Sequence, residues 1–104
     1  MKQAIRNEVL RLIRPSNRKI NKIRIGNNES LEHQNKKIEI CNRLLSEGKQ
    51  FVTEGIFEDD SGRCDVICLD TYTVYEIVCT EKEESIILKK NKYPKGLKIK
   101  VVRI

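Results

Sequence analysis

The sequence predicts one small α/β domain. Its 104 residues are a usual length for a single domain. The composition, 38% hydrophobic and 35% charged, is typical of a globular protein rather than a disordered one. From residue 30 onward, patterns typical of a helix, three strands, a second helix and a last strand follow one another. This order predicts helices packed on a sheet.

The first 29 residues are predicted to form a helix and a basic arm that precede the core domain, residues 30–104. Apolar residues at helical spacing predict a helix over Met1–Arg14, and Pro15 ends it. Residues 15–28 alternate charged residues with isoleucines. That pattern is typical either of a basic arm or of an edge strand, and both interpretations stay open.

The elements of the core domain are predicted from their hydrophobic periods and their turns. Ser30 is a favourable N-cap, and the apolar stripe after it continues until Gly48. Only residues 70–73 connect the second and third strands, so we expect these strands to pair antiparallel. The predicted ranges are a helix from Ser30 to Gly48, strands over 51–57, 63–69 and 74–80, a helix from Thr80 or Ser85 to about Asn91, and a strand over 97–102.

Charge is distributed unevenly along the chain. Residues 1–25 carry eight Lys or Arg and one Glu, and residues 85–104 carry seven Lys or Arg and no acid, whereas residues 26–84 carry six Lys or Arg and fourteen acids. Basic ends around an acidic middle favour a polyanion binder with a cation-binding centre, although two solvated basic surfaces would give the same pattern. The cations expected to contact nucleic acid are Arg14, Arg18, Lys19, Lys22, Arg24, Lys90 and Lys92.

Two acids, Asp65 and Glu76, lie inside the apolar runs of the second and third predicted strands. A buried carboxylate is unfavourable unless a cation or a hydrogen-bonding partner compensates it. Because side chains alternate along a strand, a hairpin that pairs Asp65 near Glu76 or Val78 brings both carboxylates together. Mg²⁺ prefers such oxygen ligands and can activate a water toward a phosphodiester. Without a metal, Asp65 would pair with Arg63 or a helix lysine, and Glu76 would be half exposed.

The order of elements and the two acids resemble the PD-(D/E)XK nuclease superfamily, which has the restriction-endonuclease-like fold. The segments that carry the resemblance are Gly62–Ile67 with the first acid, Tyr75–Val78 with the second, and Lys92–Pro94 at the end of the following helix. It extends over Ser30–Ile104. Small archaeal or viral members, among them Holliday-junction resolvases, look similar in length and order. The resemblance implies an α-β-β-β-α-β core around a mixed central sheet.

The resemblance also implies a site. Asp65 and Glu76 would hold Mg²⁺ or Mn²⁺, and the first core helix would supply a glutamate, for which Glu32 is preferred over Glu39. In the superfamily the third strand reads acid, any residue, lysine, and the lysine positions or activates the attacking water. Here that third residue is Val78.

The missing lysine leaves two possibilities. A lysine of the following helix replaces it, with Lys82, Lys89 and Lys90 as candidates, because a lysine side chain can reach the sheet from a helix packed on it. Alternatively, the protein binds nucleic acid without cleaving it.

The cysteines and the single histidine give weaker signals. No Cys-x-x-Cys spacing occurs, so a zinc knuckle or ribbon is not indicated. We expect small buried thiols, with a disulfide from Cys79 to Cys64 or Cys68 as an alternative. His33 follows Glu32 and is either a surface residue or a group that binds substrate or assists the attacking water.

Three functions follow from these patterns: a Mg²⁺-dependent DNA endonuclease, a nucleic-acid-binding protein on the same scaffold without catalysis, and a structural protein that dimerises through residues 1–25. A homodimer is expected, since it would stabilise a chain of this size. No apolar run approaches the ~20 residues of a membrane span, and no signal-peptide pattern is present. We therefore expect a cytoplasmic protein, in the host cell if the protein is viral.

Overall fold

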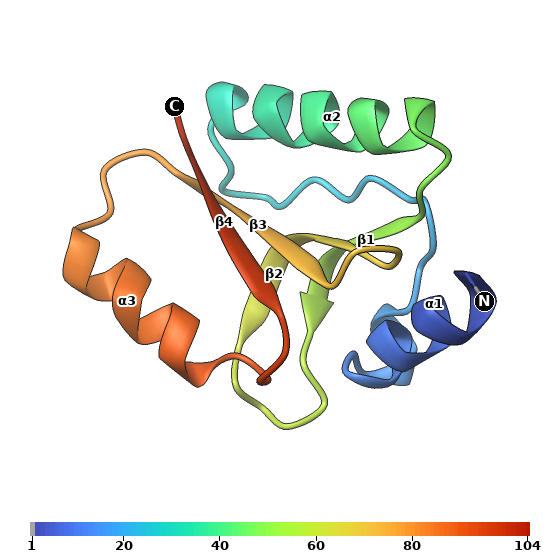
Figure 1. The fold of residues 1–104 in the computed structure, drawn as a ribbon. Helices are drawn as coiled ribbons and strands as arrows, with labels where there is room; N and C mark the ends of the chain where they lie inside the picture. Colours follow the sequence, from blue (N-terminus) through green and yellow to red (C-terminus); the bar gives the residue numbers. More distant parts are fainter. Residues whose placement is uncertain (1) are drawn as a thin grey trace.

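Four strands form one mixed sheet with helices on both faces in the computed structural model of this protein (Figure 1). The structure describes residues 2–104, so Met1, the first residue of the predicted N-terminal helix, lies outside the described residues. The strand order is β1-β2-β3-β4, with β3 and β4 parallel and the other neighbours antiparallel. The elements are α1 (Lys2–Arg11), the 3₁₀ turn η1 (Pro15–Asn17), α2 (Leu31–Ser46), β1 (Phe51–Ile56), β2 (Arg63–Cys68), β3 (Thr73–Val78), α3 (Glu83–Lys92) and β4 (Lys98–Arg103).

Most predicted elements are confirmed with shifted ends. The Ser30 hydroxyl accepts a hydrogen bond from the His33 backbone N–H at 3.1 Å and so caps α2 as predicted. Strands β2 and β3 form the antiparallel hairpin predicted from their short connection. Helix α3 begins at Glu83, between the two predicted starts. No helix within residues 2–104 is long and apolar enough to cross a membrane.

Helix α1 ends earlier than the predicted Arg14. The chain leaves the helix because Arg14 donates its backbone N–H to the Ile56 carbonyl at 2.9 Å, and Ile13 forms an isolated bridge with Phe57. These backbone bonds to the end of β1 compete with further helical turns, and proline at the next position disfavours a helical conformation at Arg14.

The segment before α2 is neither helix nor strand over residues 22–26, so the edge-strand interpretation is wrong there. The segment runs beside the edge of β1 and is bonded to it by the side chain of Thr53. The Arg24 backbone N–H donates to Thr53 Oγ1 at 2.9 Å, and this hydroxyl donates to the Lys22 carbonyl at 2.8 Å. The Thr53 hydroxyl thus takes the place of the backbone hydrogen bonds that an added strand would form with β1.

The core has two parts, one on each face of the sheet. Helix α2 lies on one face, while α1 and α3 lie on the other (Figure 1). Val9 and Ile13 are fully buried together with Phe57 and Tyr93. The N-terminal segment therefore shares a core with the strands, and these two side chains offer no surface for a dimer.

All four cysteines are free thiols, so the alternative of a disulfide is not realised. Cys41, Cys64 and Cys68 are buried as expected, whereas Cys79 is exposed just after β3. Burial raises the pKa of Cys41 to about 12, and this thiol is therefore unreactive.

Candidate functional site

Asp65 lies where the hydrogen-bonded ladder of the sheet is interrupted. The pairing of β1 with β2 skips one position, which is occupied by Glu54 and Asp65, and the pairing of β2 with β3 stops at Val66 and Tyr75. Instead, the Ile77 backbone N–H donates to Asp65 Oδ2 at 2.8 Å. The strands open here, and a carboxylate takes the place of a backbone acceptor.

The register places Glu76 opposite Asp65, one position beyond the last β2–β3 pair. Both residues line a cavity of about 300 Å³, together with Ile77 and Lys89. The two carboxylates therefore lie together, as predicted from the hairpin. Of the acids, Asp65 is the more accessible, with 20% of its side chain exposed, whereas the Glu76 residue is only 5% exposed.

The surroundings of Glu76 favour the neutral form of its carboxyl. Burial, and then the neighbouring charge of Asp65, raise the pKa of Glu76 to about 8. The Tyr93 hydroxyl is hydrogen-bonded both to Glu76 Oε1 and to the Arg63 carbonyl, the latter at 2.9 Å. The tyrosine hydroxyl donates to Glu76, which favours the ionised form and lowers the pKa, but burial and the charge of Asp65 outweigh this effect.

Among the lysines predicted to replace the missing one, Lys89 lines the cavity of the two acids, while Lys82 and Lys90 are exposed. Lys89 Nζ lies 3.0 Å from Glu81 Oε2. Partial burial works against the charge of Lys89, but the hydrogen bond to Glu81 and the charges of Glu76, Glu81 and Asp65 outweigh it and raise the pKa. Lys89 is thus a cation.

Val78, which occupies the position of the missing lysine, is 1% exposed. Val78 is two residues from Glu76, so both side chains belong to the same face of β3. The position of the missing lysine is thus occupied by a buried apolar side chain.

A second group of polar side chains, not predicted from the sequence, borders Asp65. Lys37 is fully buried in the middle of α2. Its Nζ donates to Glu29 Oε1 at 2.6 Å, to the Arg24 carbonyl at 2.8 Å and to Glu54 Oε2 at 3.3 Å. An ammonium has three N–H donors, and all three are used. The buried charge is therefore fully compensated.

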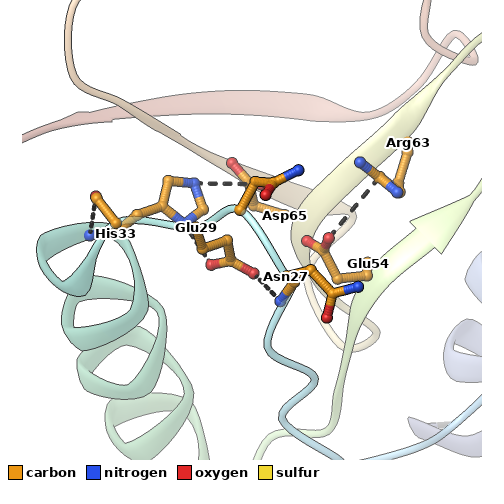
Figure 2. Close-up of a pocket in the computed structure, with 9 residues that line it drawn as sticks. Asn27, Glu29, His33, Glu54, Arg63 and Asp65 are labelled. Carbon is orange, nitrogen blue, oxygen red and sulfur yellow. Dashed lines mark hydrogen bonds and ion pairs between the residues drawn. The ribbon is translucent and has the colours of Figure 1, made fainter.

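Glu29 connects Lys37 to His33. Burial alone would raise the pKa of Glu29, but hydrogen bonds from Lys37, the Gly26 backbone N–H and His33 outweigh it and lower the pKa. His33 Nδ1 lies 2.6 Å from Glu29 Oε2, and His33 Nε2 lies 3.6 Å from Asp65 Oδ1. Figure 2 shows the imidazole ring between the two carboxylates. The histidine is thus part of the site and only 18% exposed.

Glu54 is held on β1 by an unusual backbone. Its φ of 52° is left-handed, a conformation that is uncommon for a residue with a side chain. Its carboxylate accepts from Lys37 and lies 3.8 Å from Arg63 Nε, a contact that Figure 2 marks. Strain of this kind is often retained at functional sites.

The glutamates predicted on the first core helix are not in this cluster. Glu32 is exposed, and Glu39 is exposed and pairs with Lys36 at 3.0 Å. The glutamate that contacts His33 is Glu29, which precedes the helix. Its spacing of four residues from His33 was the sequence signal for this pair.

Three cavities that share lining residues lie at the site. Their volumes are about 270, 580 and 300 Å³, and Arg63 lines all of them. Of the predicted nucleic-acid contacts, Arg24 lines the first cavity, Arg14 is paired with Asp60, and Arg18 donates to the Ile13 carbonyl. The remaining cations are exposed: Lys19, Lys22, Lys90 and Lys92.

The carboxylate oxygens of Asp65 and Glu76 are suitable ligands for a divalent cation that prefers oxygen. Within residues 2–104, however, three or more His, Cys, Asp or Glu side chains are nowhere gathered for metal binding. Water would therefore have to supply several ligands, as is usual for Mg²⁺. No family model, curated protein or solved structure gave a significant match to this chain.

Proposed function

We propose that the protein is a metal-dependent nuclease of the restriction-endonuclease-like type that hydrolyses phosphodiester bonds of DNA. One observation carries the proposal: Asp65, Glu76 and Lys89 line the same cavity. Two adjacent acids and a lysine from another element are the groups that such a reaction needs. The order of helices and strands supports the fold assignment.

Each group has a role in the proposed reaction. Asp65 and Glu76 would bind Mg²⁺ or Mn²⁺, which supplies an activated water and stabilises negative charge on the phosphate. Lys89 would orient that water or neutralise the developing charge, in place of the lysine that Val78 replaces. Exposed cations at both ends of the chain would hold the backbone phosphates independently of sequence.

A cleavage assay tests the proposal. Labelled linear, single-stranded and branched DNA is incubated with Mg²⁺ or Mn²⁺ and with the unmodified protein, Asp65→Ala, Lys89→Met or Lys36→Met. We expect Asp65→Ala and Lys89→Met to slow cleavage by at least about 100-fold, which is typical for a lost charge-stabilising group. Lys36→Met is the control, because Lys36 pairs with Glu39 on α2 and lines none of the three cavities, and it should stay within about threefold. Cleavage that survives Asp65→Ala would refute the site.

The second candidate is a protein of the same fold that binds nucleic acid without cleaving it. The buried, tyrosine-bound Glu76 favours this candidate, because its carboxyl already accepts a hydrogen bond without a cation. It predicts DNA binding that needs no metal. The logarithm of the binding constant should fall linearly with the logarithm of the salt concentration. Fluorescence anisotropy in EDTA at several salt concentrations tests it, and binding that requires Mg²⁺ would exclude it.

A further inference from the structure

The nitrogen of His33 that faces Asp65 is not engaged in a direct hydrogen bond. His33 Nδ1 is committed to Glu29 Oε2 at 2.6 Å, so Nε2 is the remaining ring nitrogen. Nε2 lies 3.6 Å from Asp65 Oδ1, which is beyond hydrogen-bond distance. Two groups that are both good metal ligands thus face each other across a small gap.

This gap has the size of a metal chelate. A nitrogen and an oxygen that each lie about 2.1 Å from one metal ion are separated by about 3.0 Å in octahedral and about 3.4 Å in tetrahedral geometry. The observed 3.6 Å differs from these values by a few tenths of an ångström. Small side-chain rotations would bring Nε2 and Oδ1 onto a common ion.

The imidazole is also oriented as metal-binding histidines are. In such sites the second ring nitrogen usually donates to a carboxylate, which fixes the tautomer and makes the ligating nitrogen more basic. Glu29 is that carboxylate here, and Lys37 and the Gly26 backbone N–H each hold it by a bond of 2.6 Å. The cap of Ser30 on the His33 backbone fixes the first turn of α2. The orientation of the His33 imidazole is therefore already fixed in the metal-free protein.

The gap is accessible from solvent. His33 and Asp65 line both the 580 Å³ cavity and the 300 Å³ cavity, so an ion and its waters can enter from either side. An imidazole beside carboxylates suits first-row transition metals, whereas Mg²⁺ prefers oxygen alone.

We propose that the cation of this site is a divalent transition-metal ion, of which Zn²⁺ is the test case, held by His33 Nε2 together with Asp65 Oδ1. Glu29 is a positioning residue that acts through His33. The inference rests on the proposed metal site at Asp65, but it concerns metal binding and does not require cleavage.

The experiment is a calorimetric titration of the metal-free protein, residues 1–104, with Zn²⁺ and, separately, with Mg²⁺. We expect Zn²⁺ to bind at least tenfold more tightly than Mg²⁺. His33→Gln should weaken Zn²⁺ binding at least tenfold and change Mg²⁺ binding by less than threefold. Glu29→Gln should weaken Zn²⁺ binding between about 10-fold and 100-fold. Glu32→Gln, an exposed neighbour, is the matched control and should change neither.

A second measurement uses the unmodified protein. His33 is the only histidine, so a ¹⁵N NMR spectrum contains one pair of imidazole signals. We expect saturating Zn²⁺ to shift the Nε2 signal far more than the Nδ1 signal. An unchanged Nε2 signal would overturn the inference, as would Zn²⁺ binding that is lost in Cys79→Ser and retained in His33→Gln, since Cys79 lines the same cavity.

The two proposals fail in different ways. Mg²⁺-dependent cleavage that is lost in Asp65→Ala but kept in His33→Gln, with no Zn²⁺ shift of His33, would leave the nuclease standing and remove the transition-metal site. Zn²⁺ binding through His33 without cleavage by any metal would do the reverse.

Discussion

Replacing Glu76 by glutamine should remove most of the pH dependence of stability between pH 5 and pH 7.5. The unfolded chain releases the Glu76 proton near pH 4.5, whereas the folded chain keeps it until about pH 8. Because the folded state binds the proton more tightly, stability falls as the pH rises between these two values. Glutamine resembles the neutral acid in shape and does not titrate.

The magnitude follows from the two pKa values. At about 1.36 kcal/mol per pKa unit, ionisation of Glu76 in the unfolded chain lowers the free energy of unfolding by ~1 kcal/mol at pH 5 and ~4 kcal/mol at pH 7.5. We therefore expect the unmodified protein to lose about 3 kcal/mol more than Glu76→Gln over this interval. That is a large part of the roughly 5–15 kcal/mol that is usual for a small domain.

Urea unfolding in EDTA at pH 5, 6, 7 and 7.5 measures the difference. EDTA is needed because a cation bound to Asp65 and Glu76 would favour the ionised form. Every other ionisable residue is the same in both proteins, so the difference between them reports Glu76. Glu32→Gln is the control and should follow the unmodified protein. If Glu76→Gln lost stability with pH as steeply as the unmodified protein, the buried, protonated state of Glu76 would be wrong.

Three further predictions concern stability and are measured by urea unfolding at pH 6. Lys37→Met should lower the free energy of unfolding by about 3–5 kcal/mol, because it leaves two partly buried carboxylates without their cation. Lys36→Met should lower it by less than about 1 kcal/mol, and equal effects of the two substitutions would contradict the buried network. Ile13→Ala should cost about 2–5 kcal/mol, as expected for a fully buried side chain, and a negligible loss would mean that the N-terminal segment is not part of the core. Gly62→Ala places a Cβ 2.8 Å from the Tyr93 ring, whereas a Cβ at Gly48 meets no atom within 4 Å. Gly62→Ala should therefore lower the free energy of unfolding by about 1–3 kcal/mol more than Gly48→Ala, and similar losses would argue against the contact with Tyr93.

The sequence predicts the helices and strands well, because the hydrophobic periods that indicate them depend only on residues close together in the chain. Helix α2 has a capping serine and one apolar stripe, and the hairpin of β2 and β3 follows from two apolar runs and a short turn. The predicted end of α1 was wrong for a non-local reason. Backbone groups of β1, far along the chain, compete for the residues before Pro15.

For the candidate site, the sequence by itself determined that Asp65 and Glu76 share a hairpin, because strand alternation and a short turn are enough to place them together. The tertiary structure decided which lysine approaches them, since the direction of α3 over the sheet brings Lys89 to the cavity and leaves its neighbours in solvent. It also decided that Lys37 is a buried cation. Its partners Glu29 and Glu54 lie on different segments, before α2 and on β1, and only the folded chain brings both within hydrogen-bond distance of Lys37.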